Sequence, residues 1–153
     1  MKNDSDRING INRIYEQEPE NPISREVLVQ YAAARFSFAI LDRSDVGKIA
    51  VRGADRFTWL QGMVSNDVRL LADGKVNSLP ACILNATGHL LSDVTLISPT
   101  SEQPFVLMVL PRGNVEKILA LLDRFIIMED VELADVSHEF DCLSYQGLDI
   151  EET

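Results

Sequence analysis

The sequence is poor in several features that would assign a protein to a class at once. Only two of its 153 residues are cysteines, Cys82 and Cys142, and neither lies in a Cys-x-x-Cys or Cys/His spacing. This argues against a structural zinc site and predicts buried, reduced thiols in a cytoplasmic protein. No apolar run is long enough to span a bilayer, and the polar segment 1–22 lacks the apolar stretch of a secretory signal.

Positive charge is missing from the last part of the chain. Residues 125–153 hold nine acidic residues and no lysine or arginine, whereas residues 1–124 hold 15 acidic and 14 basic ones. Two interpretations stay open: a solvated acidic edge, or a surface whose basic partner lies on chain absent from this sequence. Neither provides a basic patch for phosphates, so we expect no direct binding to nucleic acid.

Familiar catalytic motifs are absent as well. The sequence has no GxSxG, no P-loop, no GxGxxG and no HExxH, so the enzyme classes that depend on them have no support. Its two histidines are His89, which follows a hairpin glycine, and His138, which lies in a predicted loop. We interpret both as surface residues rather than as metal ligands or bases.

The patterns that are present predict an antiparallel α+β fold with two to three helices packed on the sheet. Helical spacing and capping residues predict helices at 24–35, 53–64 and 114–125, and apolar alternation predicts strands at 38–41, 47–51, 76–84, 89–97, 105–110, 131–136 and 140–145. Low hydrophobicity with Pro19 and Pro22 predicts a flexible arm over residues 1–22, which leaves residues 23–153 as one domain.

Several polar or aromatic residues in these elements have a simple structural interpretation. We expect Phe57 and Trp59 to anchor their helix in the core rather than to stack on a ligand. Asn66 and Asp67 are interpreted as caps of the short turn that follows this helix.

Asp93 is the one residue for which the pattern itself suggests chemistry. It lies inside a predicted strand, where a half-buried carboxylate costs free energy unless a group nearby pairs with it. Strand alternation places Asp93 with Leu91 and Thr95 on a mixed face that suits the wall of a pocket. The alternative is a carboxylate at a sheet edge that accepts backbone or arginine hydrogen bonds.

Three segments of the chain resemble the N-terminal part of the glycine-cleavage T-protein/YgfZ folate-binding family. They read GADRFTWLQGMVSNDVRLL, ACILNATGHLLSDVTLI and LLDRFIIMEDVELADVS, and the last is closer to the YgfZ-like branch. The resemblance covers residues 42–147 and implies the first part of that folate-binding fold, with the remainder of the family fold absent here. It also implies that tetrahydrofolate is the bound cofactor.

The resemblance implies roles for individual residues. Asp93 matches the family aspartate that contacts the folate near its reacting nitrogens, with Ser92 as the alternative position. A carboxylate there can stabilise positive charge on a folate nitrogen or handle its proton, so Asp93 is the predicted catalytic residue. Thr95 and Leu84 are implied to line the same pocket.

The implied function is tetrahydrofolate binding by a YgfZ-like protein that serves iron–sulfur cluster assembly or maintenance and tRNA-modifying enzymes, with iron–sulfur proteins as partners. One alternative is a folate-dependent aminomethyltransferase of glycine cleavage. Pro111 stands where T-proteins usually carry an asparagine, and the KGC motif of the YgfZ branch is missing. The other alternative is a non-catalytic interaction domain with a degenerate pocket.

Apolar residues near the end of the chain predict an exposed boundary. These residues are Phe140, Leu143, Tyr145, Leu148 and Ile150. Such a strand favours pairing with a second copy, whereas the acidic residues around it oppose this. We therefore expect a weak homodimer.

Overall fold

The computed structural model describes residues 23–99 and 104–147, so the arm predicted over residues 1–22 lies outside the described residues. The chain divides into two units. One comprises Asp42–Ser144, and the other comprises Met1–Leu41 together with Tyr145–Thr153.

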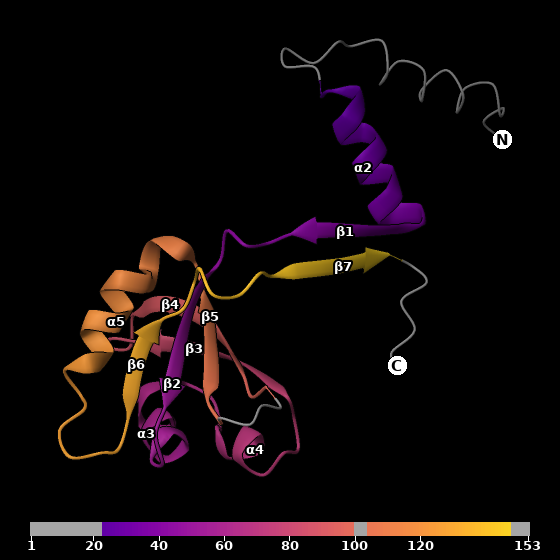
Figure 1. The fold of residues 1–153 in the computed structure, drawn as a ribbon. Coiled ribbons are helices and arrows are strands. Elements are labelled where there is room, and N and C mark those ends of the chain that lie inside the picture. The colour runs from indigo at the N-terminus through magenta and orange to yellow at the C-terminus, as the bar shows by residue number, and fades with distance from the viewer. Residues whose placement is uncertain (1–22, 100–103, 148–153) are drawn as a thin grey trace, which may run out of the picture. The chain divides into compact units, whose positions relative to one another are not determined.

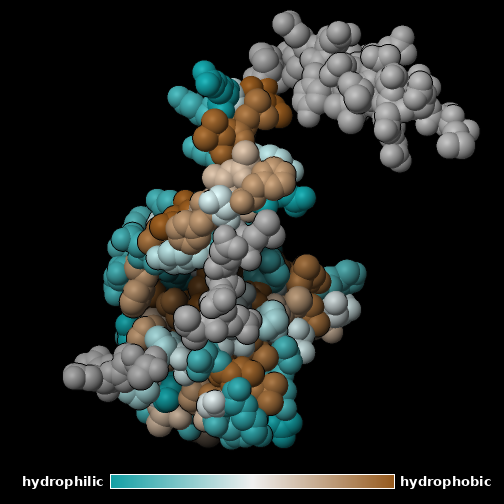
Figure 2. Space-filling view, turned by 90° about the vertical axis from the view of Figure 1, so that its right-hand side faces the viewer, coloured by the Kyte–Doolittle hydropathy of each residue, from teal (hydrophilic) through white to brown (hydrophobic). Residues whose placement is uncertain are grey.

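Within residues 23–41 and 145–147, the part of the smaller unit that the structure describes, lie one helix and most of a two-stranded sheet. Helix α2 spans Arg25–Phe36, and its N-cap Ser24 accepts a hydrogen bond from the backbone N–H of Val27 at 3.3 Å, which confirms the predicted start. Strands β1 (Phe38–Asp42) and β7 (Leu143–Gly147) pair with each other. No residue of α2 is buried, and Figure 2 shows apolar and polar atoms side by side on its surface.

The larger unit is built on a five-stranded antiparallel sheet, which confirms the predicted fold class (Figure 1). Its strands, in the spatial order β3-β4-β5-β2-β6, are Ser78–Leu84, Leu90–Ile97, Val106–Leu110, Gly47–Arg52 and Glu132–Asp135. A hairpin at residues 85–89 joins β3 to β4, and Gly88 adopts a φ of 82° there, as the predicted hairpin requires.

Three helices cover one face of this sheet and enclose the core. They are α3 (Arg56–Met63), α4 (Arg69–Ala72) and α5 (Val115–Asp123). Cross-strand neighbours on this face form apolar rows, such as Ile49, Met108, Leu96 and Leu79. These rows pack with Trp59, Leu60, Leu71, Ile118 and Leu122 of the helices in one cluster. Each fully buried large apolar side chain contributes about 1.5–3 kcal/mol to folding.

The structure confirms Trp59 as a buried core anchor, places Phe57 partly buried against the same core, and corrects other expectations about burial. Trp59 is 5% exposed and donates from Nε1 to the carbonyl of Phe125 at 3.1 Å. Phe125, the last residue of the helix predicted at 114–125, lies beyond the C-cap Arg124 of α5 and is 50% exposed. Cys82 and Cys142 are free, as predicted, but only partly buried.

Exposed apolar side chains occur where a boundary was predicted. Phe140 is 39% exposed, Leu143 53% and Tyr145 57%. Residues 148–153, which include Leu148 and Ile150, lie outside the described residues. The homodimer stays a prediction. Among the described helices, none has the length and apolarity needed to cross a membrane.

Candidate functional site

The predicted site residues Asp93 and Thr95 lie on the sheet face opposite the helices. Register places Thr95 between Pro80 and Val109, and Val109 is in turn paired with Lys48 of β2. Asp93 is paired with Cys82 of β3. Because directly paired residues project to the same side of a sheet, this face carries both polar and apolar groups. The alternation predicted for β4 is therefore confirmed.

A cavity of about 440 Å³ opens beside these residues. It is lined by Arg43, Asp45, Val46, Asp93, Val94, Thr95, Val109, Leu110, Pro111 and Arg112. Asp93 and Thr95 are thus brought together in one wall. Leu84 does not line the cavity, because it lies at the end of β3 opposite Leu90 and is 43% exposed. The binding roles of all three residues stay predictions.

The Asp93 carboxylate is exposed and has no polar partner among the described residues, in hydrogen bonds or ion pairs. The expectation of a half-buried carboxylate with a burial cost is therefore wrong, because α3, α4 and α5 of this unit pack on the opposite face of the sheet. The edge-strand alternative does not apply either, since β4 lies between β3 and β5. The carboxylate is available to a ligand.

The backbone at Asp93 is held from the opposite face of the sheet. Ser92 is 3% exposed, and its hydroxyl donates to the Asp93 carbonyl at 2.9 Å. The same hydroxyl accepts from the Asn114 side-chain amide at 3.2 Å. Asn114, the first residue of the helix predicted at 114–125, is the N-cap of α5, but its side chain forms this bond to Ser92 and no capping bond. Ser92, the alternative position from the resemblance, therefore faces the core.

Two arginines border the cavity, and they differ in their partners. Arg43 pairs with Asp45, with 3.2 Å between Nε and Oδ1. Arg112 follows Pro111 in a short 3₁₀ turn, and its Nη2 lies 2.6 Å from Nε2 of His138. Pro111 ends β5 as predicted and lines the cavity, but it has no side-chain amide to offer a ligand.

A second cavity, of about 280 Å³, adjoins the first. The two share Asp45 and Arg112 as lining residues, and the second is also lined by Ser44, Ser137, His138, Phe140 and Asp141. His89 and His138 are exposed, as expected. The contact of His138 with Arg112 was not foreseen, because these residues lie 26 positions apart and no local pattern links them.

A buried lysine connects the segments around both cavities. Lys48 is 2% exposed, and its Nζ donates to the carbonyl of Val46 at 3.2 Å and to that of Ser137 at 3.5 Å. The Lys48 backbone N–H donates to Ser137 Oγ at 2.9 Å. Asp135 accepts from the Ser137 hydroxyl and backbone N–H, and these bonds lower the pKa of the Asp135 carboxyl.

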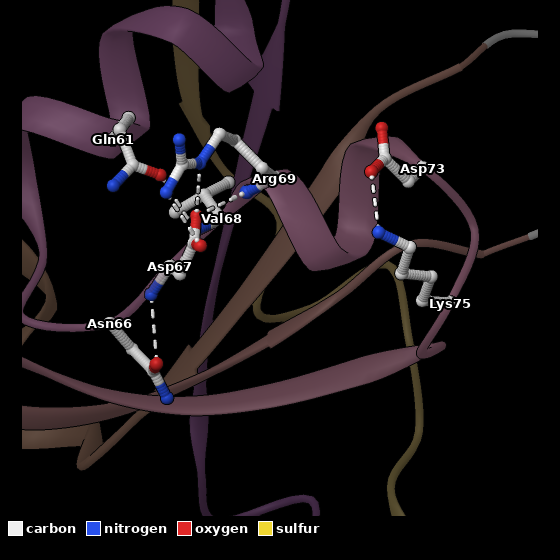
Figure 3. Close-up of polar contacts among 7 residues, drawn as sticks. All are labelled: Gln61, Asn66, Asp67, Val68, Arg69, Asp73 and Lys75. Atoms are coloured by element: carbon white, nitrogen blue, oxygen red, sulfur yellow. Dashed lines mark hydrogen bonds and ion pairs between the residues drawn. The ribbon is translucent and has the colours of Figure 1, made fainter.

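A second polar cluster surrounds Asn66 and Asp67, and its side chains have partners within the described chain (Figure 3). Asn66 Oδ1 accepts from the Asp67 backbone N–H at 2.8 Å, and Gln61 Oε1 accepts from the Val68 N–H at 2.8 Å. Asp67 accepts from the Arg69 backbone N–H and from its guanidinium at 2.7 and 2.9 Å, and this pairing lowers the pKa of the Asp67 carboxyl. Asp67 therefore stabilises the turn before α4, whereas Asn66 also donates from its side-chain amide to the carbonyl of Pro80 in β3 at 2.7 Å. The N-cap of α4 is Val68, without a side-chain capping bond, so the expected capping role is met only in part.

Metal ligation has no support in the described part of the chain. Residues 23–99 and 104–147 contain no group of three or more His, Cys, Asp or Glu side chains that could hold an ion. The arrangement instead offers one free carboxylate, one arginine without a carboxylate partner, and apolar side chains between them.

Comparison with known proteins gives a consistent result. The family model for the GCVT N-terminal domain matches residues 10–151. The chain is 30% identical over 118 residues to the aminomethyltransferase of Anoxybacillus flavithermus, which covers 77% of the chain and 31% of that protein. It is also 30% identical over 132 residues to the aminomethyltransferase of Thermoanaerobacter pseudethanolicus, covering 86% of the chain and 35% of that protein.

Solved structures agree with the sequence comparison. The crystal structure of glycine cleavage system aminomethyltransferase T from Bartonella henselae superposes with a TM-score of 0.66 at 26% identity, over 79% of this chain and 32% of that one. The chain therefore spans about a third of the length of the relatives described. These relatives are aminomethyltransferases, and the YgfZ-like branch is not confirmed.

Proposed function

The chain belongs to the GCVT N-terminal domain family, and on that premise we propose that it binds a reduced folate on the open face of its sheet, as the N-terminal part of an aminomethyltransferase-type protein. The fold is that of the aminomethyltransferase N-terminal part. The observation that carries the proposal is the free carboxylate of Asp93 in the wall of a cavity of about 440 Å³.

The chemistry of the cavity fits a folate. A reduced pterin ring has several N–H groups, and an ionised carboxylate accepts such bonds more strongly than a neutral oxygen does. Thr95 adds a hydroxyl, and Val109 and Pro111 add apolar surface for the ring. An anionic group in this position also stabilises positive charge that develops on a folate nitrogen during one-carbon transfer.

Two observations bear on the choice between aminomethyl transfer and a role in iron–sulfur cluster assembly. The names of the relatives favour one-carbon transfer by an aminomethyltransferase over a role in iron–sulfur cluster assembly. Pro111 argues against aminomethyl transfer by this chain, because proline has no side-chain amide to hold a ligand. We therefore propose folate binding as the function of this chain, and aminomethyl transfer as the reaction of the larger protein type to which its relatives belong.

The test is a titration with 5-formyltetrahydrofolate, a reduced folate that resists oxidation, followed by ¹⁵N–¹H NMR of the chain. Since the chain spans about a third of its relatives, we expect weak binding, which NMR detects at millimolar ligand. The amide signals of Asp93, Thr95 and Val109 should move. Asp93→Asn should weaken binding by about 1–3 kcal/mol, the range for loss of a charge-assisted hydrogen bond.

The matched control is Asp123→Asn, which removes an exposed carboxylate in the last turn of α5. This variant should bind the folate as the unaltered chain does. Signal changes confined to other parts of the chain, or equal affinity of the Asp93 and Asp123 variants, would refute the proposal.

A further inference from the structure

Arg112 occupies the place where the two cavities adjoin, since it lines both of them. It enters this position because Pro111 ends β5 and the 3₁₀ turn Arg112–Asn114 begins directly after it. His138, whose ring contacts Arg112, lies in the segment that follows β6. Arg112 is thus presented both to the first cavity, of about 440 Å³, and to the second, of about 280 Å³.

The Arg112 guanidinium has no ion pair with a carboxylate in the part of the chain that the structure describes. Its polar contact is His138 Nε2 at 2.6 Å. A guanidinium can only donate, so in this contact Nε2 of His138 is the acceptor. This contact fixes the orientation of the arginine and leaves its other N–H groups available to oxygen atoms of a ligand.

None of the acidic residues nearby forms an ion pair with this arginine in the described part of the chain. Asp45 lines both cavities but is paired with Arg43. Asp135 accepts hydrogen bonds from Ser137, and the charge of Arg112 contributes to its lowered pKa without a direct contact. Asp141 lines the second cavity and forms no ion pair with Arg112 within 4.0 Å. A ligand carboxylate therefore meets a guanidinium that has no ion pair with the described residues.

The two adjoining cavities together suit an elongated ligand. Asp93 lines only the first cavity and His138 only the second, whereas Arg112 lines both. A ligand that reaches from Asp93 past Arg112 therefore extends from the first cavity into the second. Val109 and Pro111 line the first cavity and suit an aromatic or other apolar middle section.

We propose that Arg112, oriented by His138, binds the glutamyl carboxylates of the folate, while Asp93 binds its pterin ring. This inference rests on the proposed folate function and adds a second recognition point to it. Arginine is suited to this role because its planar fork matches a carboxylate with two parallel hydrogen bonds. The ligand then crosses the sheet from β4 towards the segment after β6.

The test separates the two ends with two fragments of folate. 6-Methyltetrahydropterin has the ring and no carboxylate, and p-aminobenzoylglutamate has the carboxylates and no pterin. NMR titrations of the chain use both fragments and 5-formyltetrahydrofolate, with Arg112→Gln, Asp93→Asn and the control Arg124→Gln, an exposed arginine at the C-cap of α5.

Arg112→Gln should weaken the whole folate about tenfold or more and abolish the shifts caused by p-aminobenzoylglutamate, the effect of losing charge-assisted bonds. It should leave binding of the pterin fragment unchanged, and Asp93→Asn should show the reverse pattern. Equal weakening of both fragments by Arg112→Gln, or a tail fragment that binds the variant normally, would overturn the inference while the folate function stands. Absence of shifts with the pterin fragment and the whole folate would overturn the folate function itself.

Discussion

Replacement of the buried Lys48 by methionine tests how the segments around the cavities are held. Lys48 is 2% exposed, and its ammonium has two carbonyl acceptors, at 3.2 and 3.5 Å, with no carboxylate within ion-pair distance among the described residues. The second of these bonds is long. Desolvation of an ammonium costs several kcal/mol, whereas a hydrogen bond from a charged group returns about 1.5–3 kcal/mol.

These magnitudes predict that the ammonium adds little net stability. Lys48→Met keeps a flexible apolar stem in the same space and removes the charge, so the free energy of unfolding should stay within about 1 kcal/mol of the unaltered chain or rise. Lys48→Ala also removes the stem, so it should be less stable than the methionine variant by about 2–4 kcal/mol, from lost burial and the cavity left behind.

Urea denaturation followed by circular dichroism gives both free energies, and Lys117→Met on the exposed side of α5 is the matched control. A loss of more than about 2 kcal/mol in Lys48→Met would refute the reasoning. It would mean that the ammonium is stabilised well beyond two carbonyl contacts, and that a counter-charge acts on it.

Two further predictions concern charge. Hydrogen bonds from Ser137 lower the pKa of the Asp135 carboxyl, so its contribution to stability is complete above a pH of about 4 and is lost as the pH falls through the lowered pKa. At pH 7 the Asp135→Asn variant should therefore be less stable than the unaltered chain by under about 1 kcal/mol. Thermal melts at a series of pH values should show this difference vanish in acid. The weak homodimer expected through Phe140, Leu143 and Tyr145 should become more stable as salt is added, because salt screens the repulsion between the acidic residues. Light scattering that shows a monomer at high salt and high protein concentration would contradict the homodimer.

Local patterns in the sequence were sufficient to predict β4 and its two faces. The hairpin glycine and the alternation of Leu91, Asp93 and Thr95 depend only on residues near one another in the chain. The structure accordingly places Asp93 and Thr95 in the wall of one cavity. The exposure of Asp93 was not predictable from this pattern, because it depends on which face of the sheet the helices cover.

The second half of the candidate site depends on pairing between distant segments. Arg112 and His138 meet because β6 pairs with β2, and β2 pairs on its other side with β5. Neither residue lies in a sequence motif, and neither is distinguishable by its sequence neighbours from an ordinary loop residue. The burial of Lys48 could not be predicted from the sequence for the same reason. A lysine in a strand is ordinarily exposed, and one acceptor of its ammonium is the carbonyl of Ser137, 89 positions away.

The contact between Arg112 and His138 is stabilised by the same residues that join β2 to the segment after β6. Ser137 accepts from the Lys48 backbone N–H, and Val136 donates to the Lys48 carbonyl at 2.9 Å, so the residue just before His138 is fixed to β2. Arg112 is fixed on the other side of β2, where Leu110 pairs with Gly47. A ligand that bridges Asp93 and Arg112 therefore binds to groups held by the sheet itself, and it pays little ordering cost for this end of the site.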